Sequence, residues 1–242
     1  MRKLIITGHT RGLGAALAQL YLRQGRQVLG LARGGAAWRP SENLRQVKID
    51  LSDGAALSAL LSDGLLRDFL AGAEDILLIN NAAAVSPNAL LGRQRPSEIL
   101  ASVSLNIAAP LLLANAVLAA RPAGVPLDIL HIGSGAGRKS YAGWSVYGAT
   151  KAALDHHARC MAAEGHAKLR AVCLAPGIVD TDMQAQIRAS DAAAFPLHAH
   201  FVSLKNQNSL QTAQETAAKI AAYIESPHFG KDAAADIRDI CP

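Results

Sequence analysis

The sequence predicts an α/β fold, a single Rossmann-type domain over residues 1–242, with helices on both faces of a doubly wound parallel sheet of about seven strands. Short apolar runs alternate with longer helical segments along the chain, which is the pattern of repeated βαβ units. Several of these runs are continuously apolar, as expected of strands buried on both faces. Half of the residues are hydrophobic and 18% are charged, so the chain can bury a large core.

The expected elements follow this alternation from one end of the chain to the other. Strands are expected at Lys3–Thr7, Gln27–Ala32, Gln46–Ile49, Ile76–Asn80, Leu127–Ile132, Leu169–Leu174 and Ala234–Arg238. Helices are expected at Gly12–Gln24, Ala55–Ala71, Ser97–Ala120, Val146–Gly165 and Thr212–Ile224. The long segment 176–210 contains Pro196 and follows the carboxyl end of a strand, where open α/β sheets bind ligands. We therefore expect an irregular substrate lid there rather than a disordered stretch.

The charge and the apolar runs exclude several kinds of partner. The net charge is +5, but the lysines and arginines are scattered, without the basic run that a nucleic-acid partner requires. The apolar run after Met1-Arg2-Lys3 is too short for a signal peptide. The longest later run, 110–120, falls well short of the roughly 18 residues of a membrane span. We expect a cytoplasmic protein with no nucleic-acid and no membrane partner.

The cysteines and histidines do not predict a metal site. Cys160, Cys173 and Cys241 are far apart, lack metal-ligand spacing and are interpreted as buried thiols in a reducing compartment. The pairs His156-His157 and His198-Ala199-His200 would need further converging ligands, so packing or surface roles are favoured.

A glycine-rich turn joins the first expected strand to the first expected helix. It runs Thr7-Gly8-His9-Thr10-Arg11-Gly12-Leu13-Gly14. Glycines permit a tight turn and let backbone N–H groups approach a pyrophosphate at the positive end of a helix. The alternative is an ordinary βα turn, but the position between strand and helix favours a dinucleotide site. His9 lies inside this loop and is interpreted as a permissive position near the cofactor.

The end of the second strand favours NADP over NAD. An NAD site usually places an acid there to bind the ribose 2′-OH. Here Ala32 stands at that place, and Glu42 is the nearest following acid. Arg33 can instead form charge-assisted hydrogen bonds with a 2′-phosphate, and Arg11 can approach the same group. The alternative is that both arginines are merely solvated.

Tyr147 and Lys151 stand four residues apart, on one face of an expected helix. Reduction of a carbonyl by hydride needs a proton donor beside the developing alkoxide, and a phenol with a pKa near 10 needs help to exchange protons at neutral pH. A neighbouring ammonium favours the phenolate. Ser134, thirteen residues before Tyr147, follows a strand and can hold the carbonyl oxygen, although a glycine-rich flexible turn is the alternative.

Asn106 lies inside the expected helix 97–120, where asparagine is not favoured. Pro110 follows four residues later and has no N–H, so the main-chain carbonyl of Asn106 loses its helical partner. A carbonyl freed in this way and facing the cleft can hold a water that carries protons towards Lys151. A kinked helix with a solvated asparagine is an equal alternative.

These motifs together resemble the short-chain dehydrogenase/reductase family. The run Asn80-Asn81-Ala82-Ala83 is similar to its Asn-Asn-Ala-Gly motif, and Asp50-Leu51-Ser52 is similar to its adenine-contacting segment. The resemblance implies a catalytic tetrad of Asn106, Ser134, Tyr147 and Lys151. With the residues argued above, the expected cofactor contacts are Gly8, Thr10, Arg11, Gly12, Leu13, Gly14, Arg33, Asp50, Leu51, Asn81, Ala82, Tyr147, Lys151, Pro176, Gly177, Val179 and Thr181.

A finer resemblance concerns the branch of sepiapterin reductases and bacterial benzil reductases. It rests on Gly143-Trp144, the two arginines and the tail from His228 to Asp239. It implies reduction of a ketone or vicinal diketone with NADP(H), Tyr147 being the proton donor, in a homodimer or homotetramer. Trp144 and Tyr141 either line the substrate pocket or pack under the lid. Two other functions remain, a non-catalytic NADP(H) sensor and an NAD-dependent alcohol dehydrogenase.

Overall fold

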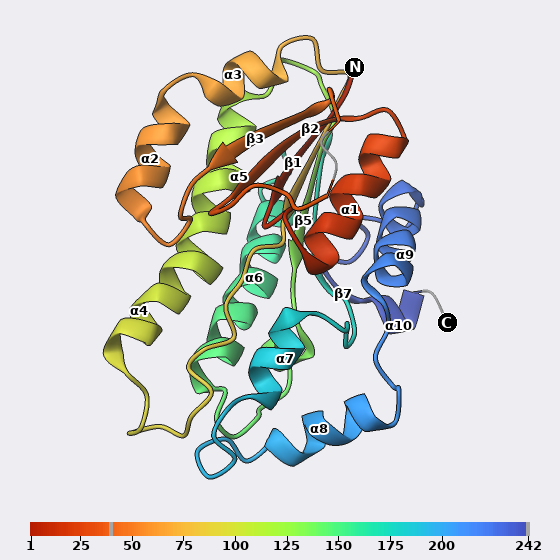
Figure 1. The fold of residues 1–242 in the computed structure, drawn as a ribbon. Helices are drawn as coiled ribbons and strands as arrows, with labels where there is room; N and C mark the ends of the chain where they lie inside the picture. The colour runs from red at the N-terminus through yellow and green to blue at the C-terminus, as the bar shows by residue number, and fades with distance from the viewer. Residues whose placement is uncertain (39–40, 241–242) are drawn as a thin grey trace.

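The computed structural model describes residues 1–38 and 41–240 and contains one seven-stranded parallel sheet (Figure 1). The strands are β1 (Arg2–Thr7), β2 (Gln27–Ala32), β3 (Leu44–Lys48), β4 (Asp75–Asn80), β5 (Leu127–Ile132), β6 (Leu169–Ala175) and β7 (Ala234–Asp236). Their spatial order is β3-β2-β1-β4-β5-β6-β7, and every neighbouring pair is parallel. The order reverses between β1 and β4, as in a doubly wound sheet, which confirms the predicted fold class.

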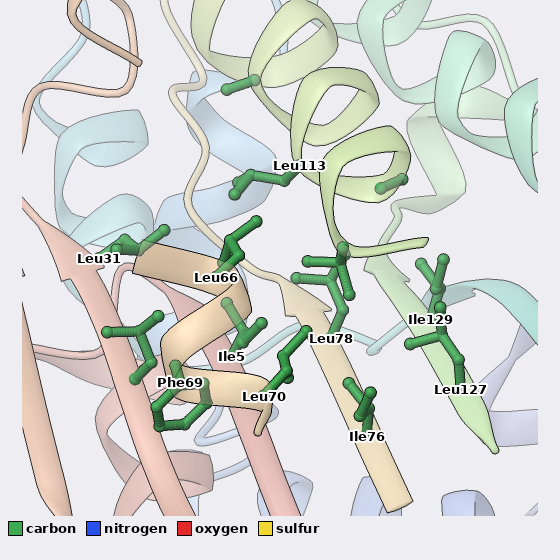
Figure 2. Close-up of a cluster of buried hydrophobic side chains, with 14 of the residues drawn as sticks. Ile5, Leu31, Leu66, Phe69, Leu70, Ile76, Leu78, Leu113, Leu127 and Ile129 are labelled. Atoms are coloured by element: carbon green, nitrogen blue, oxygen red, sulfur yellow. The ribbon is translucent and has the colours of Figure 1, made fainter. Parts of the chain in front are cut away.

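Helices cover both faces of this sheet (Figure 1). They are α1 (Gly12–Arg23), α2 (Gly54–Ser62), α3 (Leu65–Leu70), α4 (Pro96–Val103), α5 (Ala109–Ala120), α6 (Ser145–Ala163), α7 (Asp182–Arg188), α8 (His198–Asn206), α9 (Ala213–Glu225) and α10 (Ile237–Ile240). Successive side chains of a strand point to opposite faces. Leu4 and Ile6 therefore pack with α1 and α9, whereas Ile5 packs with α2, α3, α5 and α6. Figure 2 shows this second cluster, in which Ile5, Leu78 and Leu113 meet.

Several expected element boundaries differ from the structure, and three of them are informative. The helix expected at 55–71 is two helices, because the chain turns at Gly64, which has a φ of +92° that only glycine adopts readily. β3 begins at Leu44, two residues before the expected start, and ends at Lys48. The last strand ends at Asp236, where the side chain accepts a hydrogen bond from the Arg238 N–H and α10 begins.

α4 and α5 form the continuous helix that the sequence predicts, but a π-helical turn at Ser104–Ala108 joins them. The turn precedes Pro110, which cannot donate a backbone hydrogen bond. The whole segment Pro96–Ala120 is long and apolar enough to cross a membrane by length and composition, contrary to the expectation from the run 110–120. Core helices pass the same test, and Leu113 and Val117 of this helix are fully buried against the sheet.

The expectation of an irregular segment at 176–210 was wrong, because this segment contains α7 and α8. α7 begins after Thr181 with an acidic residue, Asp182, in its first turn, where the helix dipole favours a negative charge. The two helices lie together at the bottom of Figure 1. Phe195 and Phe201 of the segment pack with Trp144 in a third buried cluster, separate from the two sheet faces.

The cysteines differ from one another in burial. Cys173 on β6 is fully buried, as expected, but Cys160 on α6 is exposed because it lies on the side of the helix that faces away from the sheet. Cys241 lies outside the described residues. Within residues 1–38 and 41–240 no three His, Cys, Asp or Glu side chains come together in a way that could hold a metal ion.

Candidate active site

A cavity of about 770 Å³ lies along the carboxyl edge of the sheet. The ends of β1, β2, β4, β5 and β6 and the segment 176–210 all contribute to its lining. Every residue that the sequence predicts for the site lines this cavity except Asn106. The cavity therefore brings together the glycine loop, the tyrosine–lysine pair and the segment 176–181, which are far apart in sequence.

The glycine loop is held so tightly that one of its glycines has no room for a side chain. A Cβ on Gly14 would lie 2.2 Å from the carbonyl oxygen of Gly8 and 2.4 Å from Nδ2 of Asn81. Nδ2 of Asn81 donates to the carbonyl oxygens of Thr7 (3.0 Å) and Gly8 (3.3 Å). Oγ1 of Thr7 accepts from the backbone N–H groups of Asn81 and Ala82, both at 2.9 Å. Asn81 and Ala82 thus fix the loop in addition to lining the cavity, and this cradle of backbone fits a pyrophosphate.

The residues expected to determine the preference between NADP and NAD lie at the β2–β3 end of the cavity. Ala32 is buried there and Arg33 is exposed at the rim, where it forms no ion pair with any residue that the structure describes. Asp50 accepts hydrogen bonds from the N–H (2.9 Å) and hydroxyl (2.7 Å) of Ser52. These bonds, and to a smaller extent the Arg33 charge, lower the pKa of Asp50. An unpaired guanidinium beside the glycine loop fits a 2′-phosphate.

Arg11 has a partner that the sequence did not suggest. Its Nη1 lies 3.0 Å from a carboxylate oxygen of Asp182 at the start of α7. Both side chains are exposed, so the pair is weak. A Cβ on Gly12 would lie 3.2 Å from Cγ2 of Thr181, so the glycine loop and the start of α7 are in close contact.

His9 packs inside the sheet edge and does not line the cavity. It is fully buried, and its ring lies where a Cβ of Gly30 on β2 would otherwise stand, 2.5 Å from Nδ1. Its Nε2 is 2.9 Å from Oε1 of Gln46 on β3, and burial lowers its pKa. The interpretation of His9 as a permissive position near the cofactor was wrong. A glycine inside a strand, Gly30, was the signal of a close approach.

Tyr147, Ser134 and Lys151 meet at the middle of the cavity. Tyr147 and Lys151 lie one turn apart on α6, 6% and 3% exposed, and both line the cavity. Burial raises the pKa of Tyr147 to about 12, and the hydrogen bond with Ser134 partly offsets this rise. Oγ of Ser134 also accepts from the N–H of Ala136 at 3.1 Å, so it caps the short 3₁₀ turn that follows β5 and is not part of a flexible loop.

Lys151 is directed at the backbone of β5 rather than at the phenol. Its Nζ donates to the carbonyl oxygen of Ile132 at 2.8 Å and lies 5.8 Å from the centre of the Tyr147 ring. Burial lowers the pKa of Lys151 to about 8. The net lowering of the tyrosine pKa expected from the ammonium is not found, because desolvation of the buried phenol outweighs the hydrogen bond with Ser134.

Asn106 lies behind the cavity wall, 1% exposed, in the π-helical turn. Its Oδ1 accepts from the N–H of Ala84 (2.8 Å), and its Nδ2 donates to the carbonyl of Ala84 (2.8 Å) and the hydroxyls of Ser102 (3.2 Å) and Thr150 (3.1 Å). The alternative of a solvated side chain is therefore wrong. The amide joins the loop after β4 to α4 and α6, and a water on its main-chain carbonyl remains a prediction.

An ion pair between a partly exposed guanidinium and a buried carboxylate, one helical turn beyond Lys151, was missed by sequence reasoning. Asp155, one turn after Lys151 on α6, accepts two hydrogen bonds from Arg138, from Nε and Nη2, both at 2.8 Å. The same guanidinium donates to the carbonyl oxygens of Cys173 on β6 (3.1 Å) and Ala235 on β7 (2.9 Å). The pair thereby fixes α6 against the edge of the sheet. The spacing Lys-x-x-x-Asp was the available signal, since it places a carboxylate below the ammonium.

A second buried network lies on β5. Nδ1 of His131 is 3.1 Å from Nδ2 of Asn80, and its Nε2 is 3.1 Å from Nδ1 of His157 on α6. Complete burial, helped by the charges of His157 and Lys151, lowers the pKa of His131 to about 3. His157 thus packs against the sheet, whereas His156 is exposed, in agreement with the expected packing and surface roles.

Aromatic side chains line the end of the cavity beyond Tyr147. Trp144 is 5.2 Å from Tyr147 and 5.8 Å from Tyr141, measured between ring centres, and it packs on Phe195 and Phe201 at 5.4 and 5.2 Å. Its Nε1 donates to Oδ1 of Asn88 at 2.7 Å. Trp144 therefore does both things that the sequence left open, because it lines the cavity and also packs against the segment 176–210.

Comparisons with known proteins agree with this architecture. The family profile described as short chain dehydrogenase matches residues 2–192. The chain is 30% identical to a benzil reductase ((S)-benzoin forming) of Bacillus cereus over 95% of this chain and 96% of the relative, and 29% identical to the sepiapterin reductase of Bos taurus over 97% and 94%. A crystal structure of a short-chain dehydrogenase/reductase from Burkholderia vietnamiensis matches with 39% identity and a TM-score of 0.70, covering 98% of both chains. From the matched profile and these relatives, this chain belongs to the short-chain dehydrogenase/reductase family of oxidoreductases.

Proposed function

We propose that the protein is an NADPH-dependent carbonyl reductase that converts a ketone or diketone to an alcohol, with Tyr147 as the proton donor. One observation carries the proposal. A single cavity is lined by the glycine loop, the unpaired Arg33 and the buried group of Ser134, Tyr147 and Lys151. The family uses nicotinamide cofactors, and a bound nicotinamide would supply the hydride.

Ser134 and Tyr147 act on the carbonyl oxygen. Both hydroxyls line the cavity at the end of β5 and the start of α6, so a carbonyl oxygen placed between them can accept two hydrogen bonds. As the carbon takes up hydride, the oxygen becomes an alkoxide, and the Tyr147 phenol delivers its proton to that oxygen. Ser134 orients the oxygen throughout and stabilises the developing negative charge.

Lys151 and Asn106 support the tyrosine. The ammonium of Lys151, held by the carbonyl of Ile132, places a positive charge beside the phenolate that remains after proton transfer. It is also suitably placed on the cavity wall to hold the nicotinamide ribose. Asn106 keeps α4, α6 and the loop after β4 in register, and we propose that its main-chain carbonyl binds the water that returns a proton.

The preference for NADPH rests on the β2–β3 end of the cavity. A cationic Arg33 with no carboxylate at the position of Ala32 favours a 2′-phosphate over a ribose hydroxyl. The ketone or diketone class rests on the benzil reductase and sepiapterin reductase relatives and on the aromatic lining by Trp144 and Phe201. We further propose a cytoplasmic homodimer or homotetramer built on the long helices, where Leu100 and Val103 of α4 are exposed.

Replacement of Tyr147 by Phe tests the reaction. We expect Tyr147→Phe to lower kcat for a neutral diketone by at least a thousandfold, while the Kd for NADPH changes by less than threefold, because only the proton donor is lost. Tyr21→Phe is the matched control, since Tyr21 is a fully buried tyrosine of the core away from the cavity. Full activity of Tyr147→Phe would exclude the mechanism.

A comparison of NADPH with NADH tests the proposed cofactor preference. We expect kcat/KM to be higher with NADPH than with NADH, and Arg33→Asp to reverse this preference. Arg67→Asp, a charge reversal at an exposed residue of α3 outside the cavity, should leave the preference unchanged. If the wild-type protein binds NADPH tightly but turns over no ketone or diketone in a broad panel, the sensor alternative is favoured. If NADH is preferred from the start, the NAD-dependent alcohol dehydrogenase is favoured.

A further inference from the structure

Arg238 brings a positive charge to the substrate end of the cavity. It lies in α10, directly after β7, and lines the cavity. Ala175 of β6 pairs with Asp236, so Arg238 follows the strand that borders the segment beginning at Pro176. β7 forms one edge of the sheet and β3 forms the other, so Arg238 and Arg33 stand at opposite ends of the same cavity. Arg238 therefore lies at the opposite end of the cavity from the residues expected to bind the adenosine half of a dinucleotide.

The guanidinium of Arg238 is held in a fixed orientation. Its Nε and Nη2 donate to the two carboxylate oxygens of Asp236 at 2.8 and 2.6 Å. Its Nη1 has no hydrogen-bond partner among the residues that the structure describes, and 58% of the side chain is exposed. A bidentate pair of this kind fixes the plane of the guanidinium and leaves one N–H edge for another acceptor.

Three aromatic rings line the cavity that also holds this arginine. The ring centres of Tyr147 and Trp144 are 5.2 Å apart, and those of Trp144 and Tyr141 are 5.8 Å apart. Arg238 and Tyr141 both line this cavity. Tyr147, Trp144 and Tyr141 thus provide an aromatic lining in the same cavity that holds the proton donor and the cation.

The charges around this end of the cavity favour an anion. Of the described lining residues, only Asp50 and Asp182 carry carboxylates. Asp50 lies at the β3 end, and Asp182 is paired with Arg11. Asp180, in the same segment, is paired with Lys205, and Asp239, whose charge acts on Arg238, does not line the cavity.

We propose that the substrate is an oxo acid: an aromatic or similarly flat carbonyl compound whose carboxylate binds Arg238 while its carbonyl lies at Ser134 and Tyr147. The inference rests on the proposed function and specifies its substrate class. The body of the substrate packs on Trp144 and Tyr141. Asp236 acts as a positioning residue, because it holds the guanidinium that binds the carboxylate.

Two ligands that differ in one group test the inference. One is 1-phenylpropane-1,2-dione with a carboxylate para to the dione, and the other is the corresponding carboxamide, which has similar shape but no charge. Their Kd values for the protein–NADP⁺ complex are measured by isothermal titration calorimetry. We expect the carboxylate to bind about tenfold more tightly, the effect of one partly exposed charge-assisted hydrogen-bond pair. The ratio should shrink in 0.5 M salt.

Arg238→Gln should bring the ratio of the two Kd values to about one, and Arg238→Lys should keep part of it. Arg170→Gln is the matched control. Arg170 forms the same kind of bidentate pair, with Asp128 at 2.8 and 2.7 Å, but lies outside the cavity, so its replacement should leave the ratio unchanged. Unchanged melting temperatures of the variants show that β7 and α10 remain folded.

The outcomes separate the two proposals. A wild-type ratio of one, or a ratio that survives in Arg238→Gln, overturns the oxo-acid inference. The proposed function is judged separately, by whether the wild-type enzyme with NADPH reduces the neutral carboxamide. Because the binding ratio needs no turnover, failure of catalysis with both ligands overturns the reductase and leaves the anion site to stand or fall on its own measurement.

Discussion

The two ends of the cavity differ in the atoms that line them, which are mainly main-chain atoms at one end and side-chain atoms at the other. At the β1–β3 end, main-chain atoms of the glycine loop form the wall, and a Cβ on Gly14 would lie 2.2 Å from the Gly8 carbonyl oxygen. At the other end, side chains form the wall, with Trp144 packed between Tyr147 and the phenylalanines of the segment 176–210. Main-chain walls have little freedom to change, whereas a wall of side chains can be altered by single substitutions.

This difference assigns separate roles to the two ends. A dinucleotide presents the same phosphates to every member of a family, so a wall of backbone N–H groups suits it. A substrate differs between members, and here its end depends on residues from α6, α8 and α10 that are far apart in sequence. Substitutions at the first end should affect cofactor affinity, and substitutions at the second should affect kcat/KM for the carbonyl substrate.

The largest effect is expected at Gly14. Gly14→Ala places a Cβ against the Gly8 carbonyl and Nδ2 of Asn81, so the loop and the start of α1 must move apart. We expect the Kd for NADPH to rise at least a hundredfold and the free energy of unfolding to fall by about 3 kcal/mol, the cost of overpacking a tight site. Fluorescence titration and urea denaturation measure the two quantities. Gly54→Ala is the control, because a Cβ there meets nothing within 4 Å. Unchanged NADPH binding by Gly14→Ala would show that the loop is not a rigid cradle.

At Phe195, in contrast to Gly14, we expect a loss of activity without a loss of NADPH affinity. Phe195 is fully buried in the cluster around Trp144. Phe195→Ala leaves a cavity beneath Trp144, and such a truncation costs about 3 kcal/mol of stability. We expect kcat/KM for the carbonyl substrate to fall more than tenfold, while the Kd for NADPH stays within twofold. Phe69→Ala, in the core cluster on the sheet, should lower the melting temperature without this fall in kcat/KM. A large loss of NADPH affinity in Phe195→Ala would mean that the two ends are not separate.

The buried His131 on β5 makes the stability of the protein depend on pH. Burial lowers the pKa of His131 from 6.5 to about 3, so below pH 6.5 the unfolded chain takes up a proton that the folded chain refuses. Stability from this group is complete above pH 6.5 and falls as the pH drops towards 3, by up to about 1.4 kcal/mol per pH unit. Urea denaturation between pH 6.5 and 4.5 should show this slope, reduced in His131→Gln and unchanged when the exposed His228 is replaced by Gln. Equal slopes in all three proteins would contradict a buried neutral His131.

The sequence was sufficient to predict what depends on local pattern. The alternation of apolar runs predicts the parallel sheet, and the carboxyl ends of its strands then bring Gly8, Ser134 and Tyr147 to one edge. The four-residue spacing of Tyr147 and Lys151 fixes their common helix face. None of these inferences needs a distance between remote side chains.

What the sequence could not supply depends on such distances. The Arg138–Asp155 pair, the burial of His9 against Gly30 and the packing of Phe195 on Trp144 join residues that are remote in sequence or lack a motif. The net direction of the Tyr147 pKa was also missed, because it depends on how completely α6 and its neighbours exclude water from the phenol.

The smallest effect is expected at the contact between the two ends. The ion pair of Arg11 and Asp182 joins the glycine loop to α7, with 63% and 64% of the side chains exposed, so its loss should cost less than about 1 kcal/mol of stability. Asp182→Asn frees Arg11 and removes a negative charge from the cavity rim. We expect the Kd for NADPH to fall two- to fivefold at low salt and to return towards the wild-type value in 0.5 M salt, where the charges are screened. Asp180→Asn is the control, because Asp180 is also an exposed aspartate of the same segment but pairs with Lys205. Weaker NADPH binding by Asp182→Asn would reverse the interpretation, since it would mean that Asp182 holds Arg11 in the position the cofactor needs and that the substrate end helps to build the cofactor end.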